Sequence, residues 1–182
     1  EMYSEYKAGR HAMPEELKQQ MPVLKELLTL MGYKIVEKAG WEADDILGTL
    51  SAQMKDGDKC FIATGDRDSL QLVSDTTTVL LASTKMGRTQ TIPYDKAKIE
   101  EDYGVEPWQM IEIKALQGDS SDNIPGVRGI GDKTAIKLLK EYKDLEDIYN
   151  HIDEIKGSLK DKLINDKEMA FVSKEMATIY KD

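Results

Sequence analysis

The sequence has little of what disulfide-stabilised and membrane-bound proteins need. Its 182 residues include one cysteine, Cys60, which excludes an intramolecular disulfide framework and is typical of a reducing cytosol. Cys60 stands in the apolar run 60–63, where we expect a buried and unreactive thiol. No run approaches the roughly 18 consecutive apolar residues of a membrane-spanning helix, so no membrane partner is expected.

Basic residues are also few. The chain has 34 Asp and Glu against 25 Lys and Arg, which gives a formal net charge of −9. Proteins that bind nucleic acids usually carry a basic excess, so evenly spread acids would exclude DNA and RNA as partners. Hydrophobic residues make up 40% and charged residues 32%, which indicates a folded protein rather than a disordered one. The distribution of the acids therefore decides the function class.

The order of predicted elements divides the chain into two parts. The alternation of helices and strands in the first part predicts an α/β layer with at least partly parallel strands. The predicted elements are a helix over 42–54, a strand over 60–63, a short helix near 69–73 and β-rich runs over 76–83 and 89–92. An earlier helix begins at Pro14, is interrupted or restarted at Pro22 and ends at Gly32, and 34–36 is predicted to be a short strand. Only helices are expected after residue 94. We divide the chain into an α/β domain over 1–117 and a helical domain over 118–182.

Three acidic clusters stand at the ends of these predicted elements. They are Glu42-Ala43-Asp44-Asp45, Thr64-Gly65-Asp66-Arg67-Asp68 and Gly118-Asp119-Ser120-Ser121-Asp122-Asn123. Taken singly, each fits a helix start or a turn, where acids are common. The second cluster follows a predicted buried strand, and ligands of α/β sheets bind beyond the carboxyl ends of strands.

The seven carboxylates of these clusters are candidate ligands for Mg²⁺ or Mn²⁺. Ligand sets made only of oxygen select hard cations over zinc, and the chain offers only two His and one Cys besides. Clustered carboxylates repel one another, and cations relieve that repulsion. Two such ions can activate a water and stabilise the leaving oxygen of a phosphodiester. The clusters therefore predict metal-dependent phosphodiester hydrolysis.

A glycine-rich segment, 124–131, follows the third cluster and precedes a helix. Its glycines permit a tight turn, and free N–H groups at the start of the helix favour phosphate. Lys133, Lys137 and Lys140 follow at helical spacing. Over 126–143, five basic residues stand against two acidic ones, a local charge of +3. Such a patch binds the duplex backbone regardless of sequence, and the alternative is an ordinary solvated helix face.

Together with Gly-Val-Arg-Gly-Ile-Gly at 126–131, the three acidic motifs resemble the 5′-nuclease family. Their order and spacing are most similar to the 5′→3′ exonuclease domains of bacterial DNA polymerases I, and the resemblance covers nearly the whole chain. It implies a PIN-like α/β nuclease core with a mostly parallel sheet, followed by a helix–three-turn–helix module for duplex binding. It also implies cleavage of 5′ flaps and 5′ ends in nicked or branched DNA, during primer removal and repair, with two divalent metal ions.

The resemblance also implies which residues hold the metals. Glu42, Asp44 and Asp45 would serve the first ion, with Asp44 and Asp45 nearest the scissile phosphate. Asp66 and Asp68 would extend the site, and Asp119 and Asp122 would hold the second ion.

Other positions are implied to bind DNA. A hairpin that binds the duplex would be formed by Gly126, Gly129 and Gly131, and its backbone oxygens can hold K⁺. The contacts with the duplex would be extended by Lys133, Thr134, Lys137 and Lys140. Tyr6-Lys7-Ala8-Gly9-Arg10, within 1–20, resembles part of the arch through which the 5′ strand passes. Lys7 and Arg10 would contact the scissile phosphate, and Tyr6 would stack on a base.

The family carries further metal-binding aspartates on two N-terminal strands before the arch, and this sequence opens after them, at Glu1. We therefore expect a piece of a longer chain that includes a polymerase domain, monomeric and located in the bacterial cytoplasm with the nucleoid. Alone, it is expected to bind Mg²⁺ or Mn²⁺ weakly and to cleave DNA poorly or not at all. Two other functions stay open: a non-catalytic module that binds branched or duplex DNA even in EDTA, and a PIN-type ribonuclease, which RNA substrates would reveal.

Overall fold

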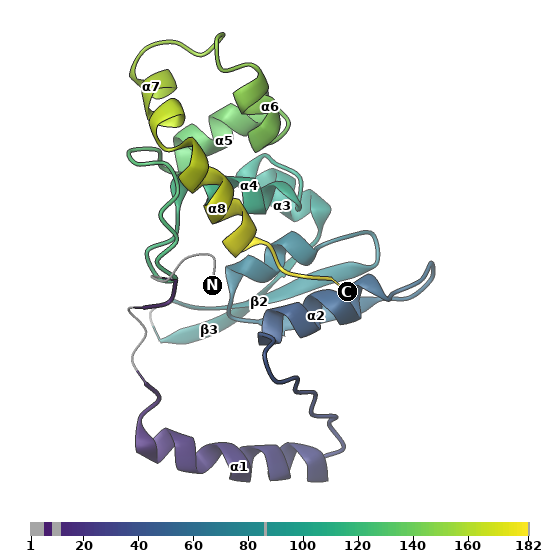
Figure 1. Ribbon diagram of the computed structural model, residues 1–182. Helices are drawn as coiled ribbons and strands as arrows, with labels where there is room; N and C mark the ends of the chain where they lie inside the picture. The colour runs from purple at the N-terminus through teal and green to yellow at the C-terminus, as the bar shows by residue number, and fades with distance from the viewer. Residues whose placement is uncertain (1–5, 9–11, 86, 182) are drawn as a thin grey trace.

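The computed structural model describes residues 6–8, 12–85 and 87–181, arranged as in Figure 1. The first half contains α1 (Glu15–Leu30), α2 (Ala43–Ala52), β1 (Cys60–Thr64), the 3₁₀ helix η1 (Arg67–Leu72), β2 (Thr77–Lys85) and β3 (Arg88–Tyr94). Six helices follow: α3 (Lys96–Tyr103), α4 (Gln109–Gln117), α5 (Asp132–Glu141), α6 (Leu145–Asn150), α7 (Ser158–Asn165) and α8 (Lys167–Ala177). The α/β part followed by helices confirms the expected fold class.

The sheet has the strand order β1-β2-β3. β1 and β2 run parallel with Ile62 opposite Val79, as the strand–helix–strand alternation predicts, and β2 and β3 form an antiparallel hairpin with Leu81 opposite Ile92. η1 packs against β1 and β2, and α3 packs against β3. Because Ile62, Val79 and Leu81 are buried, this small sheet shares the main core.

Helix α4 joins the sheet to the helical region. It contacts η1 on one side and α5, α6 and α8 on the other. Ile113, Ala115 and Leu116 of α4 are buried in the same hydrophobic core as Leu70 of η1 and Leu138 of α5. α8 then returns from the helical end of the molecule toward α2 (Figure 1). The two parts of the chain are therefore one packed unit.

Helix α1 lies apart from the rest of the molecule (Figure 1), and none of its residues is buried. It continues through Pro22, where an interruption or a second helix start was expected. The strand expected at 34–36 was wrong: this segment is irregular and exposed. None of the described strands pairs with it, so its backbone has no ladder partner. Among the described residues, no helix combines the length and apolarity needed to cross a bilayer.

Candidate metal centre and nucleic-acid interface

Six of the seven predicted carboxylates line one cleft, with a volume of about 810 Å³. The cleft lies between the start of α2, the start of η1, the loop after α4 and the segment that follows α8. The predicted carboxylates that line it are Glu42, Asp44, Asp45, Asp66, Asp68 and Asp122, and Glu175 of α8 adds a further acid. Asp119 lines a neighbouring pocket of about 250 Å³, which it shares with Asp68. The structure therefore brings together motifs that are far apart in the sequence.

Several of these acids also cap the elements that carry them. The backbone N–H of Glu42 donates to Asp45 Oδ2 over 3.1 Å, as part of a capping box at the start of α2. Asp66 caps η1, because its Oδ1 accepts from the backbone N–H of Asp68 over 2.9 Å. Capping fixes the first turns of α2 and η1. The remaining side chains of the two motifs are thereby held at the edge of the cleft.

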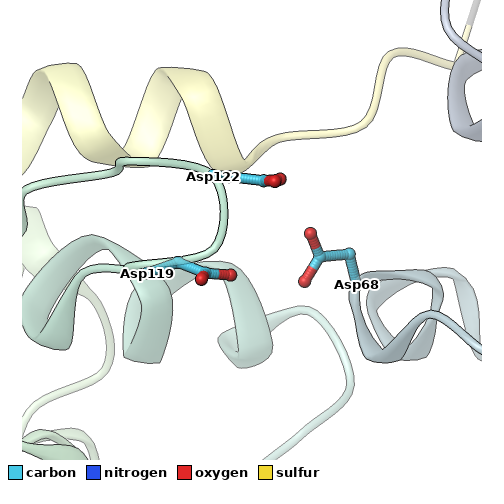
Figure 2. A group of neighbouring side chains, drawn as sticks. All are labelled: Asp68, Asp119 and Asp122. Atoms are coloured by element: carbon cyan, nitrogen blue, oxygen red, sulfur yellow. The ribbon is translucent and has the colours of Figure 1, made fainter. Parts of the chain in front are cut away.

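Three carboxylates are close enough to share an ion. One oxygen each of Asp68, Asp119 and Asp122 lies within 4.8 Å of the other two. Figure 2 shows Asp68, at the start of η1, facing Asp119 and Asp122 across a gap. Asp122 is 8% exposed, unusually low for an aspartate. These three residues could hold one metal ion between the sheet half and the helical half of the chain.

The loop that carries Asp119 and Asp122 closes on itself. Asp119 and Ile124 exchange two backbone hydrogen bonds of 2.8 Å. Gly126 has φ +61°, and a Cβ at this position would lie 2.2 Å from the backbone nitrogen of Gly118. Only glycine fits there, so the glycine-rich segment has a structural function beside any contact with DNA.

Lys114 is part of the cluster, and none of the acidic motifs indicates it. Its Nζ lies 2.8 Å from Asp119 Oδ2 and forms an ion pair with Asp68. The side chain comes from α4 and is only 11% exposed. The one sequence signal that could reveal it is a lysine between the buried residues Ile113 and Ala115 of a core helix.

Burial and mutual repulsion set the charge state of the carboxylates. Burial raises the pKa of Asp44, and the nearby charges of Asp66, Asp68 and Glu42 raise it further. Burial also raises the pKa of Asp68, although Lys114 opposes this. For Asp119, burial is outweighed by hydrogen bonds from Lys114 and Ser121, which lower its pKa to about 2. A bound cation would relieve the repulsion that Asp44 experiences.

The described part of the expected arch motif lies at the cleft. The backbone N–H of Lys7 donates to the carbonyl of Asp122 over 2.9 Å, and its ammonium forms an ion pair with Glu42. The same ammonium lies 4.7 Å from the ring centroid of Tyr6. Arg10 falls outside the described residues. Lys7 and Glu42 thus join the two ends of the segment that contains α1.

The segment after α8 ties the two halves together at the cleft. The side chain of Gln71 is buried, donates to the carbonyl of Ala177 over 3.0 Å and accepts from the N–H of Ile179 over 2.9 Å. The N–H of Tyr180 donates to Asp45 Oδ1 over 3.1 Å. Both oxygens of Asp45 therefore accept backbone N–H groups, and this use could not be read from the Glu-Ala-Asp-Asp motif.

The basic stripe lies on the exposed face of α5. Lys133, Lys137 and Lys140 are exposed, Thr134 is half-buried, and Ala135, Leu138 and Leu139 face the core. Gly131 caps the helix, and no atom stands within 4 Å of where its Cβ would be, so its backbone is open to a ligand.

Two of the expected interface groups already have protein neighbours. The carbonyl of Gly129 accepts from Lys162 Nζ over 3.0 Å. The ammonium of Lys140 lies against Gly104 at the end of α3. The part of the expected DNA-binding surface that has no protein neighbour among these contacts is therefore centred on Gly131 and the first turns of α5.

Known protein families match both halves of the chain. The model of the 5′-3′ exonuclease N-terminal resolvase-like domain matches residues 1–104, and that of the 5′-3′ exonuclease C-terminal SAM fold matches residues 105–182. The chain belongs to the 5′-3′ exonuclease family. It is 48% identical over 181 residues to the DNA polymerase I of Caldicellulosiruptor bescii and 47% identical over 182 residues to that of Bacillus subtilis. In each case 99% of this chain is covered, but only 21% and 20% of the relative, so the chain spans about a fifth of their length.

Solved structures of two other proteins have a similar fold. The T5 5′-exonuclease, in a structure with bound divalent metal ions, has a TM-score of 0.75 and 25% identity, covering 97% of this chain and 68% of that one. The catalytic core of Rad2 in complex with a DNA substrate has a TM-score of 0.57 and 20% identity, covering 94% of this chain and 59% of that one. The likeness to Rad2 concerns the fold alone.

Proposed function

We propose that this exonuclease-family chain is the metal-dependent 5′→3′ exonuclease and 5′-flap endonuclease domain of a bacterial DNA polymerase I. The observation that carries the proposal is the single cleft lined by six acidic residues from three separate motifs. The T5 relative, at 25% identity, binds divalent metal ions and has been solved with DNA and metal ions as a flap endonuclease. We further propose that the domain acts in the cytoplasm, as a monomer, in one chain with a polymerase.

The donor set fits two Mg²⁺ or Mn²⁺ ions. Every candidate ligand is a carboxylate oxygen, which favours these hard cations. Glu42 and Asp44 would hold one ion, with Asp66 beside them, and Asp68, Asp119 and Asp122 would hold the other. When bound, the ions supply Lewis-acid stabilisation of the phosphate and lower the pKa of a water.

Asp45 has a different proposed part in this arrangement. Its oxygens accept the N–H groups of Glu42 and Tyr180, so it holds the start of α2 against the segment after α8. We therefore propose Asp45 as a positioning residue. It orients Glu42 and Asp44, whereas the family resemblance alone implies that Asp45 serves the first metal ion near the scissile phosphate.

The groups for the DNA backbone lie on both sides of the carboxylates. Lys7 and Tyr6 line the cleft itself, where a cation and a ring suit a phosphate and an unpaired base. Asp132, at the start of α5, lines the pocket of Asp68 and Asp119, so that pocket reaches the first turn of α5. Gly131, Lys133, Thr134 and Lys137 would bind the backbone of the downstream duplex there. Lys140, Gly126 and Gly129 would support this surface, with K⁺ at the hairpin carbonyls.

The test is cleavage of a duplex with a 5′ flap labelled at its 5′ end. We expect slow cleavage of the flap. This cleavage should require Mg²⁺ or Mn²⁺, stop with EDTA and be lost in Asp44→Asn. Asp153→Asn is the matched control, because Asp153 is 93% exposed and pairs only with Lys160 among the contacts described. DNA binding that survives EDTA, with no cleavage by the wild type after metal is restored, would support a non-catalytic module instead. Preferential cleavage of RNA would support a ribonuclease.

A further inference from the structure

A lysine is buried inside the carboxylate cluster. The ammonium of Lys114 contacts Asp68 and Asp119, which are two of the three residues close enough to share an ion. Lysine is almost never buried without a partner, and here the stem passes through the core face of α4. The charged end therefore stands where the helical half meets the sheet half.

The charges explain how this arrangement stays together without a metal ion. Three ionised carboxylates carry −3, and one ammonium reduces the total to −2 while no metal ion is bound. Because Asp68 comes from η1 and Asp119 from the loop after α4, a shared ammonium holds together two segments whose acids repel. A cation that binds the same oxygens is repelled by that ammonium over a few ångströms.

We propose that Lys114 is a resident cation of the second metal site, and that a divalent ion binds by displacing its ammonium from Asp68 and Asp119. The proposal rests on the proposed function, since it requires that the cluster binds a metal. The side chain is long and flexible, and the adjacent pocket of about 250 Å³ contains Asp132, a further carboxylate toward which the ammonium can move. Lys114 is thus a positioning residue that sets the metal affinity of the site.

The variant Lys114→Met tests the proposal through metal binding, without an activity readout. Mn²⁺ affinity is measured by electron paramagnetic resonance and titration calorimetry. We expect Lys114→Met to bind Mn²⁺ at least tenfold more tightly than the wild type. In EDTA the variant should unfold at a lower temperature than the wild type, and added Mn²⁺ should raise its melting temperature by more than that of the wild type. Combining it with Asp122→Asn should abolish the gain in affinity, which places the effect at this cluster.

Two further lysine variants serve as controls. Lys114→Arg keeps the charge and should not bind Mn²⁺ more tightly. Lys160→Met removes another paired lysine, whose partner Asp153 is exposed and does not line the cleft, and should leave Mn²⁺ affinity unchanged.

Equal or weaker Mn²⁺ binding by Lys114→Met overturns the proposal, because a supporting ligand network would give that result. If Lys114→Met folds only when Mn²⁺ is present, this rescue of folding itself supports the proposal that the metal ion takes the place of the ammonium. Should it not fold even with Mn²⁺, Lys114→Gln decides, and failure of both with Mn²⁺ present overturns the proposal. A wild type that binds no Mn²⁺ would refute the metal site and with it the proposed function. Binding by the wild type without a gain in the variant refutes only the inference about Lys114.

Discussion

One methyl group at Gly48 is expected to weaken the attachment between the two halves of the chain. Gly48 lies inside α2, and a Cβ there would stand 2.6 Å from the carbonyl oxygen of Tyr180 and 2.7 Å from Cγ2 of Ile179. In an exposed helix, Gly→Ala would stabilise the fold by about 1 kcal/mol. Overpacking of this kind costs about 1–3 kcal/mol. We therefore expect Gly48→Ala to lower the free energy of unfolding, by up to about 2 kcal/mol once the helix gain is subtracted.

Urea unfolding measures the net change, and hydrogen exchange locates it. The N–H of Tyr180, bonded to Asp45, should exchange faster in Gly48→Ala, because the added methyl group pushes this segment away. The neighbouring substitution Thr49→Ala is the control and should leave that exchange unchanged. A Gly48→Ala protein that is more stable than the wild type, with slow exchange at Tyr180, would refute the reasoning.

Three further predictions concern charge. On acidification, Mn²⁺ affinity should begin to fall at a higher pH than it would with an ordinary aspartate ligand, because burial and nearby acids raise the pKa of Asp44. Calorimetry at several pH values, with Asp44→Asn for comparison, checks this. Lys174→Met should lower the free energy of unfolding by about 3–5 kcal/mol, since Glu112 would stay buried without its cationic partner and keep only the N–H of Leu145. Glu112→Gln in the same chain should recover part of the loss in urea unfolding. Lys133→Ala should weaken duplex binding and reduce the salt slope by about 1, whereas Lys98→Ala, on α3, should not; fluorescence anisotropy at several salt concentrations tests both.

The sequence predicts the ends of the elements and the gathering of the acids because both depend on local chemistry. Strand β1 is a short apolar run that ends at Thr64, and Gly65-Asp66 follows directly, so its end is visible in the sequence. The exposed face of α5 follows from lysines at helical spacing. Acids at the ends of neighbouring elements converge because those ends share one edge of the fold.

What the sequence does not reveal depends on distant partners. The segment 34–36 has the apolar residues of a strand, but no described strand lies beside it. Gln71 contacts residues more than 100 positions later, and no local pattern reports such a pair. Lys114 was hidden because a lysine in a helix is ordinarily solvated, and only its neighbours in α4 show that this position is buried.

The return of the segment 178–180 to α2 has a consequence for biosynthesis. A ribosome makes Glu42, Asp44 and Asp45 well over 100 residues before Tyr180, whose N–H bonds to Asp45. Contacts of such long sequence separation form late, so the emerging chain holds an unfinished cleft until α8 and these residues have left the exit tunnel. The nascent protein therefore cannot complete its acidic centre while the helical half is still being translated.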